Sequence, residues 1–180
     1  AVDDIAGATL AVEHLAAIGR RRIAFVGGPP ELSQVRDRLQ GARNALAAVP
    51  DAKLEVISTP TLTVLAGRAV GEQIRDRPAS RRPDGIFCAN DLVAIGVLQA
   101  LALMGDVMVP GDIALVGYDD IEFARSAVVP LAVSAVTSIA RGLVGSRRRY
   151  PRRCRVCRCE CTVEGEARPT ASPISRTEGG

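Results

Sequence analysis

Apolar and polar positions alternate along the first two thirds of the chain with two different periods. Short apolar runs suit buried strands, and longer segments with apolar residues three or four apart suit helices. The strand-like runs are residues 22–26, 54–58, 85–89 and 113–117. The helix-like segments are about residues 4–18, 33–49, 64–77 and 91–105, with a short helix or turn near 121–125. Strands that alternate with helices predict an α/β fold, a parallel sheet with helices on both faces.

Several residues mark the expected helix ends. Asp3 or Asp4 can cap the first helix, Gly19 can end it, and Ser33 can cap the second. Asp91 opens the fourth helix and is interpreted as its N-cap rather than as a ligand. That helix, "DLVAIGVLQALALMG", is apolar nearly all the way round, so we expect burial on most sides and close packing at its internal glycine.

Three of the expected strands run directly into glycine or polar residues. Gly27–Gly28, Asn90–Asp91 and Asp119–Asp120 follow the first, third and fourth strands. In an open parallel sheet, ligands bind outside the carboxyl ends of the strands. Glycine lets a ligand approach the backbone, the Asn90 amide donates and accepts, and the Asp119 carboxylate only accepts. An uncharged ligand rich in hydroxyls suits this set, whereas the aspartates would repel a phosphate.

Each of these residues also has a purely structural interpretation. Asn90 can be a turn residue, Asp120 can cap a short helix, and "GGPP" can be only a turn. Arg36 and Arg38 lie on an amphipathic helix, where exposure to solvent is the usual outcome. The evidence for a ligand site is therefore the coincidence of three polar strand ends at one edge of the sheet.

Four segments together resemble one known family. They are "VDDIAGATLAVEHLAAIGRRRIAFVGGP", "SQVRDRLQGARNAL", "IFCANDLVAIGVLQAL" and "VPGDIALVGYDDIEFARSAVVPL". Their order and spacing are similar to those of the effector-binding domain of LacI/GalR bacterial transcriptional regulators, which shares its fold with type I periplasmic sugar-binding proteins. The resemblance covers about residues 1–131, which we interpret as a partial effector-binding domain.

The resemblance implies a role for one residue in each of three motifs. Arg38 in "RLQG" matches the family's effector-contacting arginine on this helix. Asn90 in "AND" matches a residue that hydrogen-bonds the ligand in sugar-responsive members, and Asp119 in "GYDD" matches an acceptor for ligand hydroxyls. An arginine fork that donates, an amide that does both and a carboxylate that accepts form a coherent set. These three are the candidate effector-binding residues, and no catalytic or metal-binding residue is expected.

The function that the resemblance implies is gene regulation. The domain would bind a small effector, a sugar or related metabolite, and so control operator binding by a cytoplasmic, homodimeric repressor. Such a protein needs no cofactor, contacts no membrane and reaches DNA only through a helix-turn-helix headpiece, which is absent from these residues. The alternative is a fragment of a periplasmic-type sugar-binding protein of a transporter. Because the chain begins in the middle of the family pattern, we expect it to be part of a longer protein.

Enzymatic activity is not expected. The chain has neither a G-x-S-x-G nor a G-x-x-x-x-G-K-[ST] motif, and its single histidine, His14, falls on a helix where a polar surface position is expected. Asp119 and Asp120 are sequence neighbours, so on an extended chain they would point to opposite sides. That is poor geometry for paired acid–base chemistry.

Composition separates the end of the chain from the rest. Residues 1–130 carry 13 basic and 16 acidic side chains, whereas residues 131–180 carry 10 basic and 4 acidic ones. We interpret residues 132–180 as a divergent, disordered Arg/Cys-rich tail. Because Lys53 is the one lysine beside 22 arginines, GC-rich coding is expected, and we hypothesise a frameshift near residues 131–140, which resequencing tests.

The cysteines are distributed as unevenly as the charges. Cys88 lies alone in an apolar strand, where a buried thiol is expected. The other four lie within eight residues: Cys154, Cys157, Cys159 and Cys161. Zinc sites usually separate two short cysteine spacings by a dozen or more residues, so this cluster does not predict one. The arginine-rich stretch 147–158 could contact nucleic-acid phosphates, although a disordered basic tail is the favoured interpretation.

Overall fold

A computed structural model describes residues 3–102 and 107–119 of the chain. Its elements, in chain order, are α1 (Asp4–Ala17), β1 (Arg22–Gly27), α2 (Ser33–Ala47), β2 (Lys53–Ser58), α3 (Val64–Arg75), the 3-10 turn η1 (Ala79–Arg81), β3 (Gly85–Cys88), α4 (Asp91–Ala102) and β4 (Ala114–Val116). The four expected strands and four expected helices are confirmed. The element expected near 121–125 lies outside the described residues, as do the tail and its cysteine cluster.

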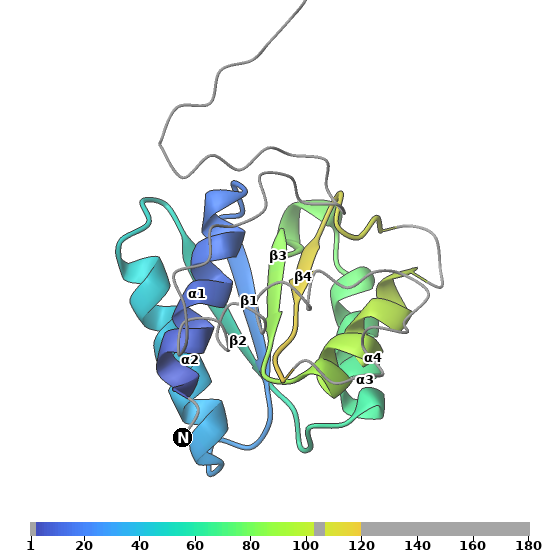
Figure 1. Ribbon diagram of the computed structural model, residues 1–180. Helices are drawn as coiled ribbons and strands as arrows, with labels where there is room; N and C mark the ends of the chain where they lie inside the picture. Colours follow the sequence, from blue (N-terminus) through green and yellow to red (C-terminus); the bar gives the residue numbers. More distant parts are fainter. Residues whose placement is uncertain (1–2, 103–106, 120–180) are drawn as a thin grey trace, which may run out of the picture. The chain divides into compact units, whose positions relative to one another are not determined.

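The four strands form one parallel sheet in the order β2-β1-β3-β4. β1 lies in the interior, where Phe25 pairs with Val56 on one side and with Phe87 on the other. Helices α1 and α2 pack against each other on one face, and α3 and α4 pack against each other on the opposite face (Figure 1). This confirms the α/β class and the helical cover on both faces.

Two hydrophobic clusters fill the two faces of the sheet. Because successive strand residues point to opposite faces, Phe87 faces α1 and α2, whereas its neighbour Cys88 faces α3 and α4. We call the α3/α4 side the aliphatic face; its buried strand residues are Ala24, Val26, Ile86, Cys88 and Leu115, and Ile113 just before β4 joins them. We call the α1/α2 side the aromatic face; it contains Phe25, Phe87 and Tyr118. The buried thiol expected at Cys88 is confirmed.

Helix ends confirm two of the expected caps and contradict two. The Asp3 carboxylate accepts a hydrogen bond from the Ala6 N–H at 3.0 Å, and Gly19 closes α1 with a positive φ of 87°. Ser33 is not the cap of α2, since it is already helical and the preceding residue makes no side-chain cap bond. Asp91 is not the cap of α4 either, because Asn90 Oδ1 accepts the Val93 N–H at 2.9 Å.

Glycines bring α3 and α4 into backbone contact. A Cβ atom on Gly96 would lie 2.0 Å from the Val64 carbonyl oxygen, and one on Gly67 would lie 2.2 Å from the Val93 carbonyl oxygen. Such distances are sterically forbidden, so only glycine permits this approach. The close packing expected at the internal glycine of α4 is confirmed, and so is the burial of that helix on most sides.

Candidate functional site

The polar strand ends gather at the carboxyl edge of the sheet. Gly27 ends β1, Asn90 follows β3 by two residues and Asp119 follows β4 by three. The strands are parallel, so these ends share one edge. At the same edge the buried Thr59, just beyond β2, donates its hydroxyl to the Gly27 carbonyl at 2.8 Å. All four strands therefore contribute to this edge.

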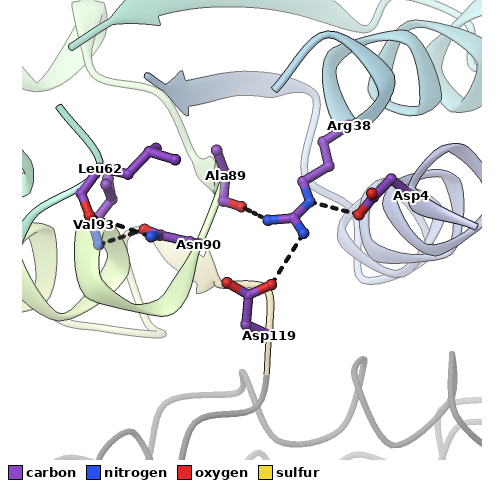
Figure 2. Close-up of polar contacts among 7 residues, drawn as sticks. All are labelled: Asp4, Arg38, Leu62, Ala89, Asn90, Val93 and Asp119. Carbon is purple, nitrogen blue, oxygen red and sulfur yellow. Dashed lines mark hydrogen bonds and ion pairs between the residues drawn. The ribbon is translucent and has the colours of Figure 1, made fainter. Parts of the chain in front are cut away.

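Arg38 of α2 is the central side chain of the site (Figure 2). Its Nε donates to Asp4 Oδ1 at 2.9 Å and its Nη2 donates to Asp119 Oδ1 at 3.0 Å. Its Nη1 donates to the Ala89 carbonyl at the end of β3. Arg38 is only 5% exposed. The guanidinium thus joins the start of α1, the end of β3 and the segment after β4 through one rigid, planar group.

The ring of Tyr118 packs against the Arg38 guanidinium. The Arg38 guanidinium carbon lies 3.9 Å from the centroid of the Tyr118 ring, within the range of a cation–π contact. Burial raises the pKa of the Tyr118 hydroxyl to about 12; the Asp4 carboxylate raises it further and Arg38 opposes this. The hydroxyl therefore stays neutral at physiological pH. Phe87 packs on the same ring, with centroids 6.4 Å apart, so the aromatic cluster extends directly into the site.

Asp119 is the partner of Arg38 that faces solvent. Its side chain is 41% exposed, and its φ of 102° lies in the left-handed region, which costs a non-glycine residue about 1–2 kcal/mol. Burial raises the pKa of its carboxyl, and this outweighs the opposite effect of the adjacent Arg38. A strained backbone and a partly desolvated carboxylate are typical of residues kept for a function rather than for stability.

Asn90 lies beside this pair but serves the scaffold with two of its side-chain atoms. Oδ1 caps α4 through the Val93 N–H, and Nδ2 donates to the Leu62 carbonyl at 3.3 Å (Figure 2). One amide N–H and one lone pair remain for other partners. The neighbouring residue, Ala89, accepts from Arg38. The structure therefore brings Arg38, Asn90 and Asp119 to one edge, with Arg38 and Asp119 in direct contact.

Two residues of the site escaped sequence reasoning. The sequence predicts only a helix cap for Asp4 and no role for Tyr118. The near-complete burial of Arg38 is also not what an amphipathic helix usually gives an arginine; the neighbouring Arg36 is exposed as expected. A signal for Arg38 was present: it lies three residues after Val35 and four before Ala42, on the same buried stripe of α2.

Asp91 and Cys88 are buried next to this edge of the sheet. Asp91 is 1% exposed at the first position of α4. Burial raises the pKa of the Cys88 thiol, and the nearby Asp91 charge adds to this effect. The thiol is thus protonated and inert. Among residues 3–102 and 107–119, no three His, Cys, Asp or Glu side chains gather in a way that could hold a metal ion.

The chain matches the family model of the periplasmic binding protein-like domain over residues 12–144. The match extends past residue 131, where we expect the domain to end. No helix in the described part of the chain is long and apolar enough to cross a membrane.

Curated relatives are transcriptional regulators. The chain is 36% identical over 131 residues to the HTH-type transcriptional regulator CelR of Thermobifida fusca, an alignment that covers 72% of this chain and 38% of the relative. It is 37% identical over 133 residues to the ribose operon repressor of Escherichia coli strain K12, with the same two coverages. The chain therefore spans well under half the length of these relatives.

A solved structure extends the similarity to the fold. A LacI family transcriptional regulator from Lactobacillus casei, crystallised with bound glucose, has a TM-score of 0.65 and 31% identity, covering 78% of this chain and 54% of that one. The same regulator has also been solved with bound sucrose and with bound Tris. The chain belongs to the periplasmic binding protein-like domain family, and it is similar in sequence and fold to part of the LacI-family regulators.

Proposed function

We propose that this chain is the ligand-sensing part of a LacI-type repressor that binds a small sugar-like effector. The observation that carries this proposal is the Arg38–Asp119 pair at the carboxyl edge of the sheet, 3.0 Å apart, with Arg38 buried and Asp119 partly open to solvent. This is the edge at which open parallel sheets bind ligands. The similarity to transcriptional regulators supports a role in gene regulation.

Three side chains would contact the effector. The Asp119 carboxylate has acceptor positions beyond the one that Arg38 uses, so it can receive ligand hydroxyls. Arg38 uses three of its five N–H groups in the contacts described above, which leaves two donors. Asn90 adds its remaining N–H. Each good charge-assisted hydrogen bond contributes about 1.5–3 kcal/mol, so a few of them give useful affinity.

The charge of the site selects against anions. Two carboxylates, Asp4 and Asp119, contact the single cation Arg38, so the cluster carries a net negative charge. A phosphorylated or acidic sugar would be repelled, whereas a neutral polyol would not. The Lactobacillus casei regulator was crystallised with glucose, sucrose and Tris, which all carry several hydroxyl groups and no negative charge. A neutral, hydroxylated effector is therefore our proposal here.

Regulation would follow from differential binding. An effector shifts a conformational equilibrium only if it binds one state more tightly than the other. The segments joined by Arg38 are the start of α1, the end of β3 and the turn after β4, so a ligand at Asp119 acts on three elements at once. For the whole protein we propose a cytoplasmic homodimer that contacts its operator through a separate DNA-binding headpiece. No catalytic step, cofactor or membrane contact is part of this proposal.

Isothermal titration calorimetry tests the proposal against a panel of neutral pentoses, hexoses and disaccharides and a second panel of phosphorylated sugars. A binder from the panel should lose affinity by about 10- to 100-fold with Asp119→Asn, which keeps the shape but removes the charge. The matched control is Arg36→Gln, one position from the buried stripe and exposed, which should bind as wild type does. Full affinity in Asp119→Asn, or a preference for phosphorylated sugars, would contradict the proposal.

A further inference from the structure

The two carboxylates that share Arg38 are placed differently. Asp4 belongs to the first turn of α1 and its side chain is 21% exposed. Asp119 lies in the turn after β4 and is 41% exposed. One partner is therefore fixed on a helix and more shielded, whereas the other lies on a strained turn and is more open.

They also bind different nitrogens of the guanidinium (Figure 2). Asp4 takes the Nε–H, the single donor next to the aliphatic stem, while the Ala89 carbonyl takes Nη1. Together these contacts fix both the position and the plane of the group, and the Tyr118 ring supports it at 3.9 Å. Nη2 is the end left to Asp119. Three of the four contacts thus hold Arg38 without Asp119.

We propose that Asp4 is a positioning residue for the effector site: it anchors Arg38 through Nε, so that Asp119 is free to exchange its contact with Arg38 for contacts with the effector. The second half of this statement rests on the proposed function, and the first half does not. Asp4 touches no ligand in this scheme and acts only through Arg38.

The consequence of losing Asp4 follows from arginine geometry. Arg–carboxylate pairs readily become bidentate, with two parallel N–H···O bonds from one edge of the guanidinium. Without Asp4, the Nε–H of a buried arginine would lack its partner, and such a donor is costly to leave unpaired. Rotation toward Asp119 would pair it again only at the more exposed carboxylate, where water exchanges its proton faster, and would occupy both carboxylate oxygens that the effector needs.

Hydrogen exchange of the Arg38 Nε–H, followed by NMR on the full chain, tests the anchor without any effector. We expect slow exchange in wild type and in Asp119→Asn, and exchange faster by about tenfold in Asp4→Ala, as for the loss of one charge-assisted hydrogen bond. Asp4→Asn, which keeps an oxygen acceptor, should restore much of the protection and serves if the alanine variant folds poorly. The matched control is Asp3→Ala, which removes the neighbouring carboxylate that caps α1 through the Ala6 N–H.

Two results would overturn the proposal. The first is wild-type exchange at Nε in Asp4→Ala, and the second is equal acceleration in Asp119→Asn and Asp4→Ala. With any sugar that the calorimetric panel identifies, Asp4→Ala should weaken binding by about tenfold, and Asp3→Ala should not. If no sugar binds the wild type, the proposed function fails, yet the exchange data still decide whether Asp4 anchors Arg38.

Discussion

The two faces of the sheet are packed with different types of side chain. On the aliphatic face, α3 and α4 approach so closely at Gly67 and Gly96 that no side chain fits between their backbones. On the aromatic face, α1 and α2 cover Phe25, Phe87 and Tyr118, and α2 directs the charged Arg38 onto the last of these rings. The same four strands supply both faces.

This difference indicates that the two faces of the sheet have different roles. We call Arg38 and the side chains that contact it, Asp4, Tyr118 and Asp119, the Arg38 cluster. The aliphatic face contains none of these side chains, so its contribution is packing. The aromatic face continues through Tyr118 into Arg38 and the carboxyl edge, so packing there also positions the site. Because Phe87 and Cys88 are neighbours that face opposite sides, one strand can be used to alter either face alone.

The largest effect is expected from Gly96→Val on the aliphatic face. Its side chain would collide with the Val64 carbonyl oxygen and other backbone atoms of α3, which cannot move without separating the two helices. We expect a loss of about 3 kcal/mol or more in the free energy of unfolding, measured by urea denaturation.

Gln99→Val is the matched control, because Gln99 lies on the exposed side of the same helix. It should cost only about 0.5 kcal/mol through helix propensity. A wild-type denaturation midpoint for Gly96→Val would mean that α3 and α4 do not make the backbone contact described here.

Arg38→Met on the aromatic face should rank second. It leaves Asp4 and Asp119 without their cation, and removing one partner of a buried pair costs about 3–5 kcal/mol. Because water reaches Asp119, we expect a smaller loss, about 2–3 kcal/mol. Urea denaturation measures it, and Arg36→Met on the exposed side of α2 should remain within about 0.5 kcal/mol of wild type. Equal stability of the two variants would show that the Arg38 cluster does not stabilise the fold.

A pair of substitutions in β3 separates packing from positioning. Phe87→Leu and Cys88→Ala each remove a few buried atoms and should each cost about 1–2 kcal/mol. Phe87 contacts the Tyr118 ring, so we expect Phe87→Leu to change the NMR shift of the Arg38 Nε–H and Cys88→Ala to leave it unchanged. If both variants shift that resonance alike, the two faces are not independent.

The smallest effect is the pH dependence contributed by Asp119. Burial raises the pKa of its carboxyl in the folded chain, so the folded state binds this proton more tightly than the unfolded state does. Stability from this group is therefore lost as pH rises from the ordinary aspartate pKa through the raised value. Asp119→Asn lacks this loss and tolerates a left-handed φ, so its stability relative to wild type should increase over that pH window and then level off. Chemical denaturation at several pH values measures the difference, and a relative stability that falls with pH would contradict the sign.

Most of the fold could be predicted because its signals are local. Apolar runs and helical spacing gave all four strands and four helices within a few residues, and Gly19 and Asp3 marked the ends of α1. The caps at Ser33 and Asp91 were wrong because several polar residues stand together at each helix start, and residue type alone does not decide which one lies just outside the first turn. The cap of α4 is Asn90 rather than the predicted Asp91, and this matters because it commits part of the Asn90 amide to the scaffold.

The sequence by itself determined the order of the elements, the parallel sheet and the polar strand ends, because these depend on periodicity and on residue type within short segments. Only the tertiary structure decided that Asp4 and Asp119 are the partners of Arg38 and that Tyr118 supports it. These contacts join residues 34 and 80 or more positions apart, on α1, α2 and the turn after β4. The energy of such a cluster exists only when the sheet and helices are packed, so no local pattern along the chain records it.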